Sequence, residues 1–437
     1  MSKGLLGSVA RSAVCAIFGA ACFAGTAAQA GSRAIHEAGE MAPSAVALAV
    51  LPPTASVADM QAREAQQTPW PTYGWTTSTP EAQGLDSEAL ADAMDTIHAR
   101  RLPVHSLLIV RHGKLVLDAY FHPFGDNQLH DVASVTKSVV STLVGIAWGE
   151  RKLSLTAPVT ALLPEGRAYA DPLKSRLTLS HLLSMTSGLD CSGNGRGNFL
   201  QAMEQSPHWT EFALARDEVA EPGTTFTYCA GNMHLASAIL TRGIGMNAAE
   251  YARERLFAPL GIRHVSWAND RDGVTHGFSD LRMQPRDMAK LGYLWLHRGA
   301  WDGRQIVPAR YLDAAFTPRA TVEQYVRYGY GMWIYPYAGH AGGPADVEAN
   351  GFGGQRIAVV PSQDMVVVIT GAGLDANKVA SLLVNTVRSN RALAPNALAQ
   401  ARLNVQVAGA AQGRSLHYAS LRPRAHRRAY RMAFAAR

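Results

Sequence analysis

The chain has 437 residues, of which 47% are hydrophobic and 17% charged, so it can bury a large core in one or two domains. Its net charge of +7 is uneven, because eleven Lys and Arg but no Asp or Glu follow residue 375, which leaves the preceding body mildly acidic. A folded basic face interleaved with aromatic side chains is missing, which excludes nucleic acid as an expected partner.

Residues 1–30 have the pattern of a secretion signal. A positive start is followed by the small and apolar residues 12–27 and by Ala28-Gln-Ala30, a small-x-small cleavage site. About sixteen apolar residues are too few to span a bilayer. Cys22 could mark a lipoprotein, but the usual large apolar residue upstream is absent. We therefore expect cleavage after Ala30 and a periplasmic or secreted protein.

Export makes a disulfide possible, because the compartments outside the cytosol are oxidising. Only Cys191 and Cys229 remain once the signal is removed. We expect a bridge between them that ties two loops beside the active site. Two separate buried thiols are the alternative.

The ordered elements follow a weakly patterned segment, residues 31–70, which we expect to be a linker or a loose arm. Apolar residues at helical spacing predict the helices 87–100, 134–149, 179–185, 247–256, 285–298 and 375–389. Alternating patterns predict two strands within 106–121, around a His112-Gly113 turn, and single strands at 355–360 and 365–370.

Strands thus lie near both ends of the chain, with helices between them. This order predicts an α+β fold with a mostly antiparallel sheet flanked by helices and an inserted helical region. The sheet domain would comprise residues 71–150 and 272–392, and the helical domain residues 151–271. Residues 393–437 form a basic C-terminal tail. We expect the tail to be disordered, and the alternative is weak contact with an anionic membrane or cell wall.

The sequence Ser134-x-x-Lys137 opens the predicted helix 134–149. Positions i and i+3 share one face of a helix, so the hydroxyl and the amine point into the same space. A serine becomes a good nucleophile when a nearby base takes its proton, and a partly desolvated lysine can be that base or tune another one. Chance alone produces about 0.4 such pairs in a chain of this composition, so further motifs are needed.

Further motifs follow in order. Ser-x-x-Lys marks penicillin-binding proteins and serine β-lactamases. The stretch Glu221-Pro-Gly-Thr-Thr-Phe-Thr-Tyr228 resembles the second motif of the class C β-lactamase, esterase and D-alanyl-D-alanine carboxypeptidase family, which includes 6-aminohexanoate-oligomer hydrolases. Residues 179–190 and 277–289 resemble two further segments of this family. The resemblance runs from about Trp75 to Ser389 and implies a β-lactamase/transpeptidase-like fold.

The resemblance also implies roles for individual residues. Ser134 would be the nucleophile, Lys137 its partner and Tyr228 the general base. A phenol has an ordinary pKa near 10, and a neighbouring ammonium would favour the phenolate and lower that pKa.

The chain departs from the family pattern after the tyrosine. Most relatives have an asparagine where Ala230 stands. Asn232, in a Tyr-x-x-Gly-Asn arrangement, is closer to the oligomer-hydrolase and esterase branch. Asn232 would either bind substrate or cap the following helix.

The oxyanion hole is expected in the segment from Ala349 to Gln355. The backbone N–H of Phe352, with that of Ser134, would hold the developing oxyanion. Gly351 and Gly353 would let the backbone approach substrate, and Gln355 would also bind it or replace Phe352 in another register. His340-Ala-Gly-Gly343 is a rival for the same role.

No cation occupies the position of the β-lactamase Lys-Thr-Gly lysine in this register, which weakens an antibiotic-hydrolysing function. Arg356, Arg196 or Arg327 could substitute. No metal motif such as His-Glu-x-x-His occurs, and no metal or organic cofactor is expected.

Together these features predict an exported serine hydrolase that cleaves a small ester or amide through an acyl-enzyme on Ser134. A β-lactamase or D-alanyl-D-alanine carboxypeptidase is the alternative enzyme. The non-enzyme alternative is a catalytically silent cell-wall-binding protein on the same fold.

Overall fold

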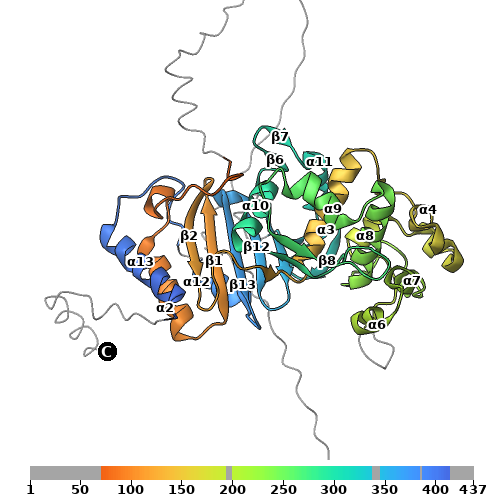
Figure 1. Cartoon of the computed structure of the whole chain (residues 1–437), viewed down its shortest axis with the longest axis horizontal. Coiled ribbons are helices and arrows are strands. Elements are labelled where there is room, and N and C mark those ends of the chain that lie inside the picture. Colours follow the sequence, from red (N-terminus) through yellow and green to blue (C-terminus); the bar gives the residue numbers. More distant parts are fainter. Residues whose placement is uncertain (1–69, 193–198, 337–344, 384–385, 414–437) are drawn as a thin grey trace, which may run out of the picture. The chain divides into compact units, whose positions relative to one another are not determined.

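The computed structural model describes residues 70–192, 199–336, 345–383 and 386–413. The predicted signal segment and nearly all of the predicted arm lie outside this part of the chain. The described residues all belong to one compact unit, shown in Figure 1. Within them, no helix has the length and hydropathy needed to cross a membrane.

An antiparallel sheet lies at the centre of this unit, with the strand order β2-β1-β13-β12-β11-β10-β9-β8 (Figure 1). Its strands are β1 (Val104–Arg111), β2 (Lys114–Tyr120), β8 (Ala320–Glu323), β9 (Val326–Tyr328), β10 (Trp333–Tyr335), β11 (Asp346–Gly351), β12 (Gln355–Val360) and β13 (Met365–Gly371). Two small sheets comprise β3 (His130–Asp131), β5 (Leu281–Met283) and β4 (Val265–Trp267), and β6 (Ala300–Trp301) with β7 (Arg304–Gln305). The predicted α+β fold with a mostly antiparallel sheet is confirmed.

The central strand β13 divides the core into two layers. All of its residues are buried, because it has a neighbouring strand on each edge and helices over each face. Val366 and Val368 contribute to one hydrophobic cluster, and Val367 and Ile369 to the other. Its run of β-branched residues suits such a doubly covered strand.

Helices cover both faces of the sheet (Figure 1). On one side lie α2 (Ser87–Ala99), α12 (Ala376–Leu383) and α13 (Ala397–Ala411). On the other lie α10 (Pro285–Leu296) and α3 (Val135–Gly149), with α8 (Ala230–Ile244) packed against α3. The remaining helices are α4 (Val159–Leu162), α5 (Leu179–Leu183), α6 (Phe199–Gln205), α7 (Trp209–Leu214), α9 (Ala248–Ala252) with the π-helical turn η4 (Arg253–Phe257), and α11 (Ala309–Ala315).

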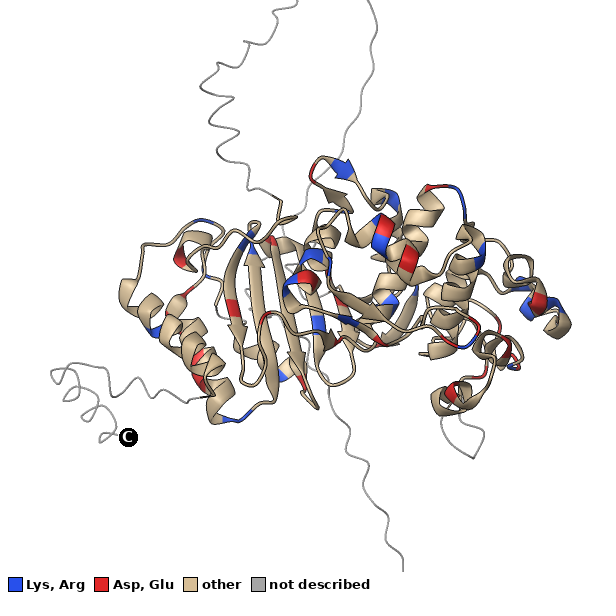
Figure 2. Cartoon of the chain, viewed as in Figure 1, with Lys and Arg blue, Asp and Glu red and all other residues tan. Residues whose placement is uncertain are grey.

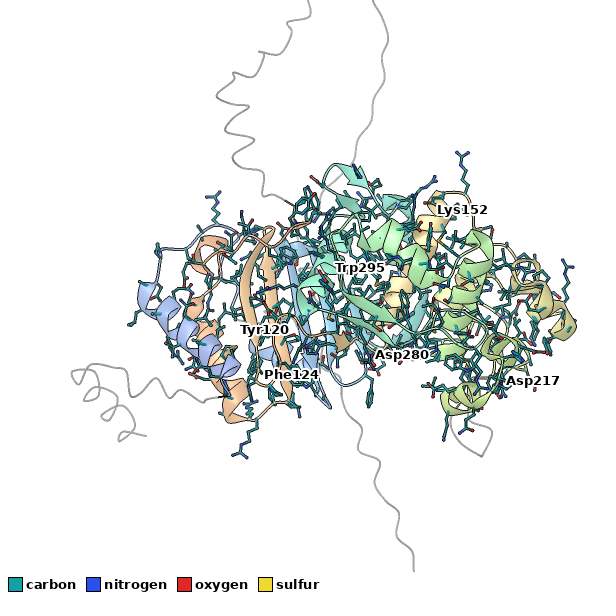
Figure 3. The ribbon with its side chains drawn as sticks, viewed as in Figure 1. Tyr120, Phe124, Lys152, Asp217, Asp280 and Trp295 are labelled. Carbon is teal, nitrogen blue, oxygen red and sulfur yellow. A yellow bond between two sulfur atoms is a disulfide. The ribbon has the colours of Figure 1, made fainter. Side chains whose placement is uncertain are left out.

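Helix α3 is surrounded by protein, and all of its residues up to Ala147 are buried. Its polar side chains find partners on neighbouring elements. Ser138 Oγ donates to Gly331 O at 2.6 Å, and Trp295, labelled in Figure 3, donates its indole N–H to Thr142 Oγ1 at 3.1 Å. The start of α3, where Ser134 lies, is therefore held in a fixed position.

The helical region 151–271 forms one unit with the sheet rather than a domain of its own. One hydrophobic cluster contains residues of α5, α8 and α9 together with residues of α3, α10 and β13. The predicted boundary at residue 151 therefore marks a change of secondary structure within a continuous core.

The predicted start of the tail at residue 393 is wrong, because α13 folds back onto α2. Arg402 of α13 binds the carboxylates of Glu88, Asp92 and Asp95 on α2, at 2.6, 2.6 and 2.5 Å. Figure 2 shows basic and acidic residues interspersed over the elements of the described chain. Residues 414–437, with most of the predicted tail arginines, lie outside the described residues.

One predicted helix ends earlier than expected. Helix α12 ends at Leu383, and Val387 instead forms a bridge with Leu85. The predicted helix 247–256 is confirmed, since α9 and the π-helical turn η4 together extend from Ala248 to Phe257. The other predicted helices and strands of the described chain lie within a few residues of their expected bounds.

Candidate active site

Ser134 is the N-cap residue of α3, and the chain enters it through a strained turn. Ala133 has φ +47°, a left-handed conformation that a non-glycine residue adopts at a cost. Two hydrogen bonds hold this turn: Ala133 N–H donates to Asp131 Oδ1 at 2.8 Å, and Val132 N–H donates to Leu281 O at 2.9 Å. The turn thus presents Ser134 at the tip of a rigid helix.

Lys137 lies one turn further along α3, and its side chain points back to the serine. Nζ lies 2.8 Å from Ser134 Oγ and donates to Phe278 O at 3.0 Å. The residue is only 3% exposed, and burial lowers the pKa of its amine to about 7. A large fraction of the amine is therefore neutral at physiological pH and can accept a proton.

Tyr228 precedes Cys229, the N-cap residue of α8, and lies beside this pair. Its ring centroid is 5.0 Å from Lys137 Nζ. Although 40% of the residue's surface is exposed, desolvation raises the pKa of its phenol to about 12, and a hydrogen bond with Ser134 offsets part of that rise. The predicted lowering of this pKa by an ammonium is wrong, because desolvation of the phenol is the largest effect and raises it. Tyr228 therefore rests as a neutral phenol.

Gly351, the last residue of β11, lies against the backbone of Ser134. A Cβ at this position would approach Val132 O to 2.3 Å and Ser134 N to 3.2 Å, so only glycine fits. Phe352 follows directly, with 89% of its surface exposed. The end of β11 thus lies beside the start of α3, the arrangement in which the backbone N–H groups of residues 134 and 352 could serve one oxyanion.

The side chain of Gln355 is bound to the backbone of the neighbouring strand β13. Its side chain is buried and bonds Gly371 in both directions: Nε2 donates to Gly371 O at 2.5 Å, and Oε1 accepts from Gly371 N at 3.4 Å. Its side chain is thus engaged with the backbone of β13, and its contact with substrate stays a prediction. Gly353 has φ +81° and forms the turn between β11 and β12.

Asn232 does not have its predicted capping role. It is fully buried in the first turn of α8, where Cys229 is the N-cap residue and no side chain caps the helix. Its Nδ2 contacts Met185 Sδ at 3.8 Å, and its Oδ1 has no hydrogen-bond partner among the described residues. Binding of substrate by this buried side chain stays a prediction.

A disulfide joins Cys191 to Cys229, with 5.8 Å between their Cα atoms. It connects the loop after Asp190 to the residue that follows Tyr228. Arg216 also binds Asp190, at 2.9 Å. The bridge therefore fixes the start of α8 and with it the backbone that carries the tyrosine.

Sequence analysis missed two contributors to this site. One is the carbonyl of Phe278, which no side-chain pattern can reveal. The other is Trp333 on β10, whose ring centroid lies 5.5 Å from that of Tyr228. An isolated aromatic residue in a short strand pattern carries no signal that would distinguish it from a core residue.

The position of the Lys-Thr-Gly lysine is occupied by Ala349, which is fully buried. The suggested substitutes are otherwise engaged or outside the described chain. Arg356 binds Glu348 and the side chain of Asn377, and Arg327 donates to carbonyls of its own hairpin. Arg196 and the rival segment 340–343 lie outside the described residues.

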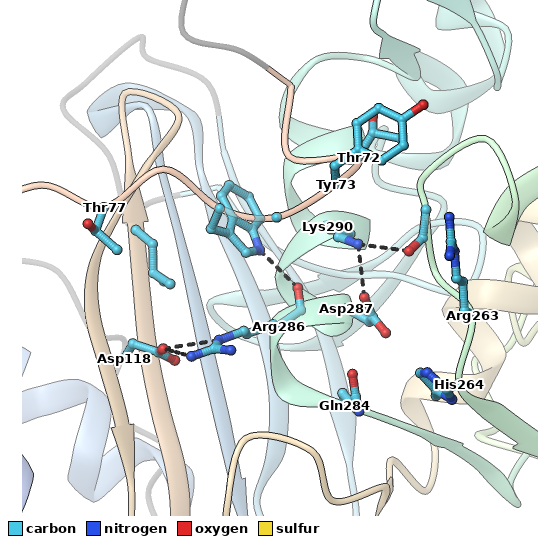
Figure 4. Close-up of a pocket in the computed structure, with 14 residues that line it drawn as sticks. Thr72, Tyr73, Thr77, Asp118, Arg263, His264, Gln284, Arg286, Asp287 and Lys290 are labelled. Atoms are coloured by element: carbon cyan, nitrogen blue, oxygen red, sulfur yellow. Dashed lines mark hydrogen bonds and ion pairs between the residues drawn. The ribbon is translucent and has the colours of Figure 1, made fainter.

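A separate pocket of about 550 Å³ lies between residues 72–77 and the start of α10 (Figure 4). Ser134 is not among its lining residues. Its charged side chains are largely paired, since Lys290 binds Asp287 at 3.1 Å and Arg286 binds Asp118 at 2.5 Å. Within the described chain, no group of three or more His, Cys, Asp or Glu side chains is arranged to hold a metal ion.

Comparison with known proteins agrees with this geometry. Residues 87–403 match the family model described as Beta-lactamase, and the chain belongs to this family. The resemblance predicted from the motifs is thus confirmed.

Two curated relatives indicate the branch. Esterase EstB of Burkholderia gladioli is 29% identical over 216 residues, which cover 44% of this chain and 55% of the esterase. The 6-aminohexanoate-dimer hydrolase of Paenarthrobacter ureafaciens is 22% identical over 254 residues, covering 54% and 64%. The chain thus matches less than two thirds of either relative.

Among solved structures, a penicillin-binding protein homologue from Caulobacter crescentus has a TM-score of 0.58 at 18% identity, covering 72% of this chain and 98% of the homologue. At this identity the likeness establishes a shared fold.

Proposed function

We propose that this protein is an exported serine hydrolase that cleaves a small ester or amide by acyl transfer through Ser134. The observation that carries the proposal is the 2.8 Å contact between Ser134 Oγ and a buried lysine amine whose pKa is about 7. Such an amine is neutral in a large fraction of molecules at physiological pH and is matched to general-base catalysis there.

The pKa shifts of Lys137 and Tyr228 support one assignment of the proton transfers. Neutral Lys137 takes the proton of Ser134 as Oγ attacks the substrate carbonyl. The backbone N–H groups of Ser134 and Phe352 hold the oxyanion. Tyr228, a neutral phenol, donates its proton to the leaving oxygen or nitrogen and regains one from Lys137. Water then repeats the sequence on the acyl-enzyme. This assignment exchanges the roles that the sequence resemblance implied for Lys137 and Tyr228.

The surroundings of the serine and the names of two relatives support a substrate class. β-Lactams and peptidoglycan stems carry a carboxylate, which a cation at position 349 would bind, and Ala349 offers none. The printed names of the two curated relatives describe an esterase and an amide-dimer hydrolase. We therefore place neutral esters first, small amides second, and β-lactams or peptidoglycan stems as the alternative, which the shared fold supports.

The proposal predicts covalent labelling at one residue. A fluorophosphonate should label the wild-type protein, and Ser134→Ala should abolish labelling. Ser138→Ala is the matched control, because this serine lies one turn further along the same helix and bonds only Gly331 O. Equal labelling of wild type and Ser134→Ala would disprove the assignment. Turnover of p-nitrophenyl acetate and of nitrocefin, measured on the same sample, ranks ester against β-lactam.

Export is proposed from the signal pattern, and the disulfide beside the site suits an oxidising compartment. Cell fractionation should recover the protein outside the cytoplasm, with an N-terminus at residue 31. A protein that stays cytoplasmic with residues 1–30 intact would contradict this. Weak contact of the basic tail with an anionic membrane or cell wall is part of the same proposal. It should appear as salt-sensitive binding to anionic vesicles or peptidoglycan that is lost when residues 414–437 are deleted.

A further inference from the structure

The amine of Lys137 has two partners, and one of them is a backbone carbonyl. Its Nζ donates to Phe278 O at 3.0 Å while it contacts Ser134 Oγ at 2.8 Å. Proton transfer from the serine requires the nitrogen lone pair to face Oγ. The position of the Phe278 carbonyl therefore decides whether the amine is oriented for that transfer.

The loop that carries Phe278 is fixed at its start by backbone contacts. His276 N–H donates to Ala268 O at 2.9 Å, and Trp267 donates its indole N–H to His276 O at 2.9 Å. A Cβ on Gly277 would lie 2.0 Å from Met233 O, so this part of the loop is pressed against α8. The loop thus enters Phe278 from a defined direction.

The end of the loop is held by side chains. Asp280, labelled in Figure 3, has φ +65°, a left-handed conformation that few non-glycine residues adopt. Its Oδ2 accepts hydrogen bonds from His276 Nδ1 at 2.8 Å and from Ser279 Oγ at 2.6 Å. The His276–Asp280 pair therefore closes the loop on both sides of Phe278 and offsets the backbone strain.

The same loop continues into the support of the serine. Leu281, the residue after Asp280, accepts the hydrogen bond from Val132 N–H, two residues before Ser134. His276 itself packs on Trp209, at 4.4 Å between ring centroids, and its side chain is only 13% exposed. Other titratable groups that interact electrostatically with the pair are Glu204 of α6, Arg282 of β5 and His234 of α8.

We propose that the His276–Asp280 pair positions the catalytic lysine by closing the loop around Phe278, so that its carbonyl holds the amine of Lys137 against Ser134. His276 and Asp280 are positioning residues, which act through the backbone of the residue between them. The proposal rests on the proposed function, since it concerns the orientation of the base in acylation.

The test measures the rate of labelling by a fluorophosphonate across pH. Asp280→Asn and His276→Gln should each label about 10- to 100-fold more slowly, as expected when a reacting group is misplaced by a fraction of an ångström to 1 Å. The apparent pKa of the labelling rate should also fall, because the lost carbonyl contact no longer favours the ammonium. Asp272→Asn is the matched control. It removes a similar but more exposed pair, His208–Asp272 at 3.0 Å, and should label within about twofold of wild type.

Asp280→Gly distinguishes the effect of the carboxylate from the effect of the backbone conformation. Glycine adopts φ +65° without strain but has no carboxylate. Slow labelling of this variant supports the proposal. A wild-type rate overturns it, because the backbone conformation alone would then suffice. Wild-type rates and pH profiles in both Asp280→Asn and His276→Gln also overturn it. Undiminished labelling of Ser134→Ala would instead reject the proposed function itself, so the two failures are distinguishable.

Discussion

Replacing Lys137 with methionine should stabilise the fold near neutral pH while abolishing acylation. In the unfolded chain the amine has its ordinary pKa of 10.5. In the folded protein, burial lowers the pKa of the amine to about 7. Between these two values the unfolded state binds more protons, so lowering the pH destabilises the native protein. At pH 7 the buried lysine therefore lowers the free energy of unfolding by about 5 kcal/mol, at 1.36 kcal/mol for each unit of difference between the two pKa values.

The substitution also removes favourable contacts. Methionine cannot donate to Ser134 Oγ or Phe278 O, two hydrogen bonds worth about 1 kcal/mol each. We therefore expect Lys137→Met to be about 3 kcal/mol more stable than wild type at pH 7 and about 2 kcal/mol less stable at pH 10.5. The stability difference changes sign between these pH values.

Urea unfolding at several pH values from 7 to 10.5 measures this crossing. Other titrating groups contribute to both proteins and cancel in the difference. Ser134→Ala is the control, since it keeps the lysine and should follow the pH dependence of the wild type. A difference between Lys137→Met and wild type that stays constant over this range would refute the argument, because it would place the pKa of the folded amine near its ordinary value.

Three further substitutions test the site and the fold. Tyr228→Phe should lower ester turnover about 100-fold or more. The loss should be greater with alkyl esters than with p-nitrophenyl esters, because the p-nitrophenolate leaving group needs no proton. Equal losses with both kinds of ester would exclude Tyr228 as the proton donor. Gly351→Ala should reduce both turnover and melting temperature, because its Cβ would meet Val132 O at 2.3 Å, whereas Gly125→Ala, whose Cβ approaches only Asn127 at 3.7 Å, should leave both unchanged. Arg402→Ala should lower the free energy of unfolding in urea by about 1–3 kcal/mol without changing turnover, because removal of a largely buried arginine leaves three carboxylates of α2 unpaired. An unchanged midpoint would show that α13 is held by apolar contacts alone.

The sequence predicted the part of the site that depends on local spacing and on motifs. Ser134 and Lys137 meet because one helical turn separates them, and helix periodicity is visible in the apolar residues around them. Tyr228 was identified through its motif, and Gly351 through the requirement for close backbone approach. Each of these signals lies within a few consecutive residues.

Long-range backbone contacts were not predictable in the same way. Gln355 bonds the backbone of Gly371, and Lys137 bonds the carbonyl of Phe278; every residue has such groups, so the sequence does not mark the ones that are used. Helix α13 did leave a signal. Asn396 caps its start by accepting from Ala399 N, and Gly413 follows its end with φ +66°. Residues 393–437 contain no acidic side chain, so their composition resembles that of a disordered basic tail. The carboxylates that bind Arg402 of α13 lie far away in the sequence, on α2.

Burial decides which way the proton moves between Lys137 and Tyr228. In water, the ordinary pKa values of the two groups are close to each other. Inside the protein both charged forms are disfavoured, so the amine shifts down to about 7 and the phenol up to about 12. The resting pair is therefore a neutral base beside a neutral acid, rather than an ammonium beside a phenolate. Because Ser134 contacts both groups, one can accept its proton as the other donates to the leaving group, and no charge has to persist in the buried site after acylation.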